Sequence, residues 1–480
     1  MIHTLTSYQQ DALRYTKNRL RIALFLEMRL GKSVVAIRWL KRVKAQRILL
    51  VAPLTTLLGS LNWQGELTRE GVTPVLLSLL AKEKRIDALY PSRLVRATPE
   101  NIKWSHRQIV AVTPRMPMYR LTRSWAHGWF GINYEALRTQ PEILDAPWDA
   151  IILDESTRIR SPKAQITKTL LQRTSHIKHR AILTGLPNPE NPLDYFCQFV
   201  FLHGTFMGFS NFWSFRHALF YTGWTEWDWM PKPKTRDRIK AYVHEHAFVL
   251  TRKQAGVGST KVRRQRSVEL NAAQRRVMKE MRTKFEVDGV ETKWTTVVHT
   301  WMQRVAGGFH PTSLELISDA KIRLTESLIM EDFRKEPVVI WFRFNEEIRH
   351  VRRWLKKRQR QLTVEVVHGA VHKRERPKIQ ERFQDGTTQV LLMQVKLGRY
   401  GWNLSRSSTA IYYSNSYEFE DRSQSEDRII HLTKKKACLY LDLVTLGTPD
   451  EDVVAALSSK RLNARLYNNA LQSSVVRHVP

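Results

Sequence analysis

Residues 25–33 read FLEMRLGKS and end in Gly31-Lys32-Ser33, the closing residues of a phosphate-binding loop. Such loops hold phosphate on main-chain N–H groups at a helix start, while the lysine reaches the β/γ-phosphates and the hydroxyl ligates Mg²⁺. RIALFLE before the loop can form a strand, and KSVVAIRWLKRV after it is apolar at helical spacing. This setting predicts a nucleotide site at Lys32 and Ser33. Leu26, where the general pattern has glycine, and Arg29 are departures from it.

A second group of candidate residues is the acidic pair Asp154-Glu155, at the end of the apolar run WDAIILDES. Carboxylates that follow a buried strand are favoured by a bound cation such as Mg²⁺. We expect Asp154 to hold the metal through water and Glu155 to orient or deprotonate the attacking water. The alternative is a solvated turn without chemistry.

Apolar runs at intervals predict the elements that position these residues. Continuous runs alternating with helical segments are typical of parallel sheets covered on both faces. We therefore expect two α/β domains, residues 1–200 and 313–480, with a largely helical insertion and linker at 201–312. The runs are residues 47–53, 108–112, 148–156, 180–185, 337–342, 363–369, 389–394, 409–414 and 438–444.

In order along nearly the whole chain, the motifs resemble those of the Snf2-related branch of superfamily 2 helicases and DNA translocases, particularly compact versions from phages and mobile elements. LTSYQQDAL resembles the opening segment, in which Gln9 would read adenine. EMRLGKS resembles the family's E-M-G-L-G-K-T, so the missing first glycine is normal there and Arg29 is the unusual residue; it would join Gly31 in binding the nucleotide. LTGLPNPEN resembles the motif that couples the nucleotide to the other lobe. The resemblance implies two RecA-like lobes and a Snf2-type insertion.

Other segments resemble the family's nucleic-acid contacts. VAPLTTL and INYEAL resemble segments that face the tracked DNA strand, which implies roles for Thr55, Asn133 and Tyr134. GRYGWNL resembles a motif of the second lobe, where Gly401 would contact nucleotide and Asn403 nucleic acid.

QSEDRIIH resembles the family's Q-x-x-x-R-x-x-R motif, whose arginines complete the hydrolytic site. Arg428 occupies the first arginine position and His431 the second. A neutral imidazole stabilises developing charge less well than a guanidinium. The sequence leaves open whether turnover is slow, His431 acts protonated, or one of Lys434, Lys435 and Lys436 compensates.

The charge of the chain indicates a polyanionic partner: 78 Lys and Arg against 45 Asp and Glu, a net charge of +33. Among the basic segments, 261–266 and 373–378 are expected in loops, where Arg263 and Arg264 would contact phosphates. Residues 349–360 are expected to form a helix whose arginines face solvent, because Ile348, Val351 and Leu355 recur at helical spacing.

The sequence thus predicts a DNA-dependent ATPase that uses ATP and Mg²⁺ to move along or remodel duplex or branched DNA. RNA is not excluded as a substrate, and protein partners in replication, recombination or restriction are conceivable. Strand separation is an alternative activity, and a nucleic-acid-binding protein with weak or lost ATPase activity is another. The 2 cysteines, with no apolar run of membrane-spanning length and no secretory signal pattern, favour a cytoplasmic location without a membrane partner.

Overall fold

In the computed structural model, most of the chain can be described. The described residues are 4–58, 62–96, 109–110, 119–123, 125–185, 191–222, 229–257, 260–284, 286–287, 290–291, 295–372, 375–398, 401–431, 434 and 436–472.

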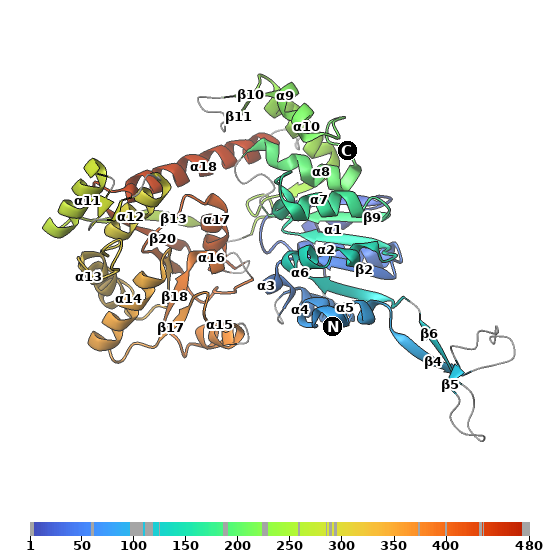
Figure 1. The fold of residues 1–480 in the computed structure, drawn as a ribbon, viewed down its shortest axis with the longest axis horizontal. Helices are drawn as coiled ribbons and strands as arrows, with labels where there is room; N and C mark the ends of the chain where they lie inside the picture. The colour runs from blue at the N-terminus through green and yellow to red at the C-terminus, as the bar shows by residue number, and fades with distance from the viewer. Residues whose placement is uncertain are drawn as a thin grey trace. The chain divides into compact units, whose positions relative to one another are not determined.

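Contacts divide the chain into two compact units, Met1–Leu250 and Thr251–Pro480. Each unit is built on its own sheet, and every pair of neighbouring strands in both sheets is parallel. Figure 1 shows both sheets with their helices. The prediction of two parallel-sheet lobes is confirmed.

The sheet of the first unit has seven strands in the order β12-β1-β9-β8-β2-β7-β3. Its central strands are largely apolar and buried, because helices cover a parallel sheet on both faces. The strands are β1 (Arg21–Leu26), β2 (Arg47–Val51), β3 (Val75–Leu76), β7 (Gly128–Ile132), β8 (Ala150–Asp154), β9 (His179–Leu183) and β12 (Ala247–Leu250).

Helices connect these strands. They are α1 (Ser7–Tyr15), α2 (Lys32–Arg42), α3 (Leu54–Leu57), α4 (Trp63–Arg69), α5 (Lys82–Leu89), α6 (Tyr134–Thr139), α7 (Gln165–Arg173), α8 (Tyr195–His203), α9 (Phe212–Leu219) and α10 (Thr235–His246). The short strands β10 (Phe220–Thr222) and β11 (Trp229–Pro231) form an antiparallel pair between α9 and α10.

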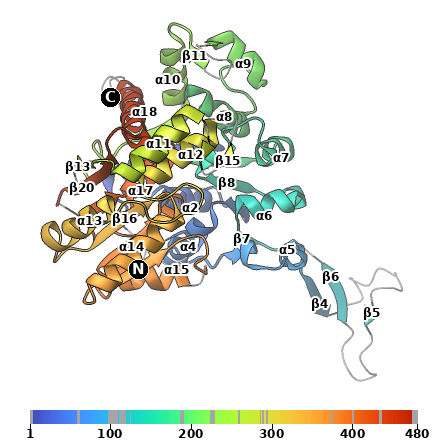
Figure 2. The ribbon, with the colours of Figure 1, turned by 60° about the vertical axis from the view of Figure 1, so that its left-hand side comes forward.

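One predicted strand lies outside the parallel sheet. The run at 108–112 contributes β5 (Ile109–Val110) to a small antiparallel sheet with β4 (Ser92–Arg96) and β6 (Tyr119–Arg123). Figure 2 shows β4 and β6 side by side. Expecting this run in the parallel sheet was wrong, because an apolar run specifies a strand but not its partners.

The sheet of the second unit has six strands in the order β13-β20-β19-β16-β18-β17. They are β13 (Lys261–Val268), β16 (Val338–Phe342), β17 (Val364–Val367), β18 (Val390–Gln394), β19 (Thr409–Tyr412) and β20 (Cys438–Thr445). The helices are α11 (Ala272–Lys284), α12 (Thr295–Ala306), α13 (Ala320–Ser327), α14 (Asn345–Arg358), α15 (Glu375–Asp385), α16 (Val395–Gly398), α17 (Phe419–Asp427) and α18 (Pro449–Gln472). A short hairpin consists of β14 (Glu286–Val287) and β15 (Val290–Glu291).

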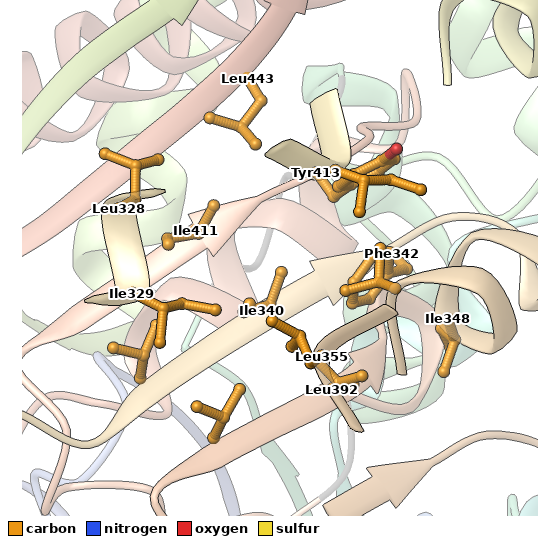
Figure 3. Close-up of a cluster of buried hydrophobic side chains, with 14 of the residues drawn as sticks. Leu328, Ile329, Ile340, Phe342, Ile348, Leu355, Leu392, Ile411, Tyr413 and Leu443 are labelled. Atoms are coloured by element: carbon orange, nitrogen blue, oxygen red, sulfur yellow. The ribbon is translucent and has the colours of Figure 1, made fainter. Parts of the chain in front are cut away.

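Alternate residues of the second sheet serve two cores. On one face, Ile340 and Phe342 pack in a cluster with the buried side of α14 (Figure 3). On the other, Val339 and Trp341 pack in a cluster with side chains of α15. The α14 contacts come from Ile348, Val351 and Leu355, so the predicted apolar stripe of this helix is confirmed.

The predicted insertion contributes to both units. Residues 201–312 contain helices α9 to α12, but they also supply β12 to the first sheet and β13 to the second. The division into 1–200, 201–312 and 313–480 stays a prediction.

Candidate nucleotide site and nucleic-acid contacts

The loop between β1 and α2 has the backbone of a phosphate cradle. Arg29 and Gly31 take left-handed conformations with φ of 70° and 83°. Gly31 is the N-cap of α2, and no side chain caps the helix there. The first main-chain N–H groups of a helix have no partner within it, so they can bind an anion. Leu26 is a fully buried residue of β1, which explains why this position takes no glycine.

Gln9 lies against this loop. Its Nε2 donates to the Leu30 carbonyl at 3.3 Å, and its Oε1 accepts from the Thr6 main-chain N–H at 3.1 Å. A Cβ atom on Gly31 would lie 2.2 Å from that Nε2. The glycine therefore answers two needs, a positive φ and the close approach of Gln9. The predicted reading of adenine by Gln9 stays a prediction.

Lys32, the first residue of α2, and Asp154, the last residue of β8, interact electrostatically in the first unit. The Lys32 ammonium donates to the Leu26 carbonyl at 2.9 Å. Asp154 ends β8, and its Oδ2 accepts from the Trp63 indole N–H at 2.8 Å. Burial raises the pKa of the Asp154 carboxyl, while the Lys32 charge and the Trp63 hydrogen bond offset part of the rise. Ser33, the second residue of α2, is partly exposed.

Glu155 and the start of the next motif are also neighbours. Glu155 has a left-handed backbone with φ of 51°, and its Oε2 lies 3.5 Å from the Thr184 hydroxyl that follows β9. A Cβ on Gly185 would lie 3.2 Å from the Met28 main-chain nitrogen, so this segment packs directly on the phosphate loop. The motif predicted to couple the nucleotide to the other lobe thus contacts both the loop and the acidic pair. Its residues 186–190 lie outside the described residues.

Three predicted nucleic-acid residues of the first unit differ in their surroundings. The Thr55 hydroxyl is buried without a hydrogen-bond partner in the described part of the chain. Asn133 is the N-cap of α6, and its Nδ2 donates to Glu135 Oε2 at 2.8 Å. Tyr134 is 4% exposed, and its hydroxyl donates to the Asp154 carbonyl at 2.8 Å. Tyr134 therefore supports Asp154 from the core rather than presenting a surface to nucleic acid.

In the second unit, Gly401 and Asn403 lie in the loop after α16. Gly401 has φ of 56°, a conformation that favours glycine. The Asn403 main-chain N–H donates to Gln380 Oε1 at 2.8 Å, and its carbonyl accepts from Gln384 Nε2 at 2.8 Å. Both hydrogen bonds fix the backbone of the loop, and the side-chain Oδ1 of Asn403 accepts from the Ser405 N–H at 3.3 Å. A nucleic-acid contact of Asn403 stays a prediction.

Arg428 is the C-cap of α17 and is 8% exposed. Its Nε donates to the Gly398 carbonyl at 2.7 Å, and its own carbonyl accepts from the Leu404 N–H at 3.0 Å. The two motifs predicted around Gly401 and Arg428 are therefore joined by hydrogen bonds. His431 follows three residues later and is partly exposed.

The lysines expected to compensate for His431 have other partners. Lys434 Nζ donates to the carbonyls of Ser405, Ser407 and Ile429 at 2.7, 2.5 and 3.2 Å. Lys436 forms an ion pair with Glu336 at 2.5 Å. Lys435 lies outside the described residues. Lys434 therefore stabilises the main chain around Ser405 to Ile429. His431 is the residue whose substitution tests the second arginine position.

The basic segments predicted as loops are regular structure. Residues 261–266 lie in β13, which pairs with β20, and α15 begins at Glu375 within the segment 373–378. Arg263 Nη2 pairs with Glu426 Oε2 at 2.6 Å, whereas Arg264 is exposed. The loop predictions were wrong, because local charge does not show that a strand completes a sheet edge. Phosphate contacts of both arginines stay predictions, and ion pairing makes Arg263 the weaker candidate.

Sequence patterns missed several residues that build the site. No sequence pattern marked Trp63 as a site residue. It lies 91 residues from Asp154 in the chain, and only the fold brings its indole next to this carboxylate. Thr184 lay within a recognised motif, but its contact with Glu155 required the fold. Gln198 of α8 accepts from the Ser156 hydroxyl at 2.7 Å and thereby supports the residue after the acidic pair.

Comparisons with known proteins agree with this geometry. Two parallel-sheet units, the first with a phosphate loop, define a protein with two RecA-like lobes. The profile described as SNF2-related domain matches residues 8–293, more than half of the chain, and that of the helicase conserved C-terminal domain matches residues 320–432. The chain therefore belongs to the SNF2-related family.

Two relatives match over short segments. A Bacillus subtilis (strain 168) protein named as a candidate ATP-dependent helicase/translocase, YwqA, is 26% identical over 98 residues, which are 20% of this chain and 11% of that protein. The SWI/SNF-related matrix-associated actin-dependent regulator of chromatin subfamily A-like protein 1 of Drosophila melanogaster is 32% identical over 75 residues, 16% of this chain and 10% of that protein. The matched segments thus span about a tenth of either relative.

Among solved structures, the Sulfolobus solfataricus SWI2/SNF2 ATPase core in complex with dsDNA is similar with a TM-score of 0.41 and 18% identity, over 98% of this chain and 93% of that chain. Within the described residues, no helix has the length and apolar character needed to cross a membrane. In the same residues, no group of three or more His, Cys, Asp or Glu could hold a metal ion.

Proposed function

We propose that this protein hydrolyses ATP with Mg²⁺ and uses the energy to move along or remodel duplex or branched DNA. The observation that carries the proposal is the convergence, within the first unit, of an uncapped helix start at Gly31, the Lys32 ammonium, the buried Asp154 carboxylate and Glu155. The helix start and Lys32 are suited to bind phosphate. Asp154 is suited to hold a metal ion, and Glu155 to orient a water molecule. A structural role alone would not favour a buried carboxylate beside a loop whose residues Arg29 and Gly31 have positive φ.

The residues present fit a nucleotide with Mg²⁺. Asp154 and the Ser33 hydroxyl are hard oxygen donors of the kind that Mg²⁺ takes together with phosphate oxygens. When bound, the ion would neutralise charge on those oxygens. Lys32 would bind phosphate by exchanging the Leu26 carbonyl for a phosphate oxygen. Glu155, held near Thr184, would orient water and accept its proton on a carboxylate oxygen. Gln9 and Arg29 would contact the nucleotide beside Gly31.

Arg428 is proposed to stabilise the charge that develops during hydrolysis, and Gly401 to contact the nucleotide. An arginine in this role can contribute about 10³–10⁵ in rate. His431 favours the second candidate function, a nucleic-acid-binding protein with weak or lost ATPase activity. Retention of Lys32 and Glu155 favours the active enzyme. Strand separation shares the same chemistry and is the other alternative.

Nucleic acid is the proposed partner because the chain carries a net charge of +33. Thr55 is proposed as a contact because its segment, VAPLTTL, resembles the family segment that faces the tracked DNA strand. Asn133, Asn403 and Arg264 are proposed as further contacts. RNA as a substrate, protein partners in replication, recombination or restriction, a cytoplasmic location and a phage or mobile-element origin also remain proposals.

The test is steady-state ATP hydrolysis with no nucleic acid, single-stranded DNA, duplex DNA, a branched junction and RNA. Glu155→Gln serves as the blank, because it keeps the shape of the side chain and removes its basicity. We expect duplex or junction to stimulate hydrolysis strongly in the wild type and not in the blank. A wild-type rate equal to the blank on every substrate, with tight DNA binding, would instead support the binding protein.

His431→Arg separates the two candidates further. If the second arginine position limits turnover, this variant should raise kcat while leaving DNA affinity unchanged. An unchanged or lower kcat would show that the imidazole is not the limiting group.

A further inference from the structure

Eight of the nine residues of α17 are polar, yet seven of these eight are buried. Among these are Glu426 and Asp427, at 2% and 8% exposure, which directly precede Arg428. Buried carboxylates require charged or hydrogen-bonding partners. The partners that hold Glu426 and Asp427 therefore also fix the position of the Arg428 backbone.

The partners of Asp427 come from the segment that follows β12. Asp427 Oδ1 pairs with Lys261 Nζ at 2.7 Å and with Arg252 Nη2 at 2.8 Å. Lys261 Nζ also lies 3.2 Å from Glu426 Oε2, which Arg263 contacts at 2.6 Å. Burial alone would raise the pKa of both carboxyls, but the nearby cations outweigh it and lower the pKa of Glu426 and Asp427 below their ordinary values, so both are ionised at neutral pH.

Arg428 has hydrogen bonds of its own, to residues outside this network. Its Nε donates to the Gly398 carbonyl at 2.7 Å, and its carbonyl accepts from the Leu404 N–H at 3.0 Å. The ion pairs of Asp427 hold the preceding residue. Loss of those ion pairs would remove the side-chain anchor of the residue directly before Arg428, while Glu426 would keep its own partners.

The same segment is continuous with the strand beside the phosphate loop. Leu250, the last residue of β12, accepts at its carbonyl from the Glu27 N–H at 3.0 Å, and Glu27 is the first loop residue after β1. Arg252 lies two residues further along the chain. Thr251 between them is held by Gln254 Oε1, which accepts from its N–H at 2.8 Å and its hydroxyl at 3.0 Å. The connection from Glu27 of the phosphate loop to Arg252 is therefore short, and hydrogen bonds hold it at Leu250 and Thr251.

We infer that Arg252 and Lys261 are positioning residues for Arg428. Through their ion pairs with Asp427, they couple the segment that follows β12 to the position of this arginine. This inference rests on the proposed ATP hydrolysis. It assigns a catalytic consequence to an ion-pair network that would otherwise serve only the stability of the second unit.

The experiment compares Arg252→Ala with Arg382→Ala, a matched control. Arg382 also pairs with two carboxylates of the second unit, Glu365 of β17 at 2.8 Å and Glu375 of α15 at 3.2 Å. Both variants are measured for DNA-stimulated kcat, KM for ATP, duplex affinity and Tm. A misplacement of about 1 Å can lower a rate about 100-fold, so we expect Arg252→Ala to lose about 10- to 100-fold in kcat. KM and duplex affinity should stay within about twofold, and Arg382→Ala should keep its kcat.

Two further variants separate positioning from folding. Arg252→Lys keeps the charge and should restore much of the lost kcat. Arg252→Met combined with Asp427→Asn leaves no unpaired charge at this position, so it should keep the wild-type Tm while kcat stays low. Equal kcat in Arg252→Ala and Arg382→Ala, or wild-type kcat in the double variant, would overturn the inference while leaving the proposed function intact. A wild type no faster than Glu155→Gln would overturn both.

Discussion

Glu347 is fully buried in the second unit, and its replacement by glutamine should remove a pH-dependent loss of stability. It lies in the first turn of α14, where its Oε2 accepts from the Phe344 N–H at 3.2 Å and from the Ser414 hydroxyl at 2.5 Å. Burial raises the pKa of this carboxyl from 4.5 to about 7, although the Ser414 hydrogen bond and the Lys321 charge oppose the rise. Its other oxygen has no hydrogen-bond partner among the described residues.

The sign of the effect follows from the direction of the pKa shift. The folded state binds the Glu347 proton more tightly than the unfolded state does, so this contribution to stability is fully present below pH 4.5 and is lost as the pH rises through about 7. At about 1.4 kcal/mol per pH unit, the full loss is about 3 kcal/mol. That is a large part of the roughly 5–15 kcal/mol by which a domain is stable.

The assay is urea unfolding of the wild type and Glu347→Gln between pH 5 and pH 8.5. We expect the glutamine variant to be slightly less stable than the wild type at pH 5 and about 2–3 kcal/mol more stable at pH 8.5, since its amide cannot ionise. Glu346→Gln, on the partly exposed neighbour, controls for the loss of one charge. Parallel pH profiles for the wild type and Glu347→Gln would refute the reasoning, because they would mean that Glu347 does not titrate in this range.

Two further predictions concern the nucleotide site. Trp63→Phe removes the indole hydrogen bond that lowers the pKa of Asp154, so the acid limb of the ATPase pH profile should move to higher pH, and an unmoved limb would contradict this role. Gly31→Ala places a Cβ where Gln9 lies and strains a positive φ, so titration with a fluorescent ATP analogue should show affinity weaker by about tenfold. Gly71→Ala is its control, because it has a φ of 75° with no atom within 4 Å, and an equal loss of affinity there would show that strain alone is responsible.

Much of the fold could be predicted from the sequence because its central strands are local features. Buried parallel strands must be continuously apolar, so runs such as RILLV and VVIWF mark themselves. The phosphate loop and the acidic pair were predictable for a related reason. Each combines a strand end with residue types that only a few chemistries favour, and their spacing along the chain is short.

The partners of each element could not be predicted in the same way. β12 and β13 lie in a region that shows no regular strand period, and each becomes a strand by completing an edge of a sheet. The ion pair of Arg263 with Glu426, 163 residues away in sequence, could not be predicted from the basic segment alone. Tyr134 likewise resembled a surface contact, and its hydroxyl instead supports Asp154.

The sequence by itself determined the order of the motifs, the two parallel sheets and the residues that could bind phosphate and metal. The tertiary structure decided which side chains hold these residues in place. Trp63 donates a hydrogen bond to Asp154, and the Thr184 hydroxyl lies near Glu155. Arg252 and Lys261 form ion pairs with Asp427, which precedes Arg428. Strand formation is set largely by neighbouring residues and hydrophobic burial. Hydrogen bonds and ion pairs between distant segments depend on how the sheets place those segments in space.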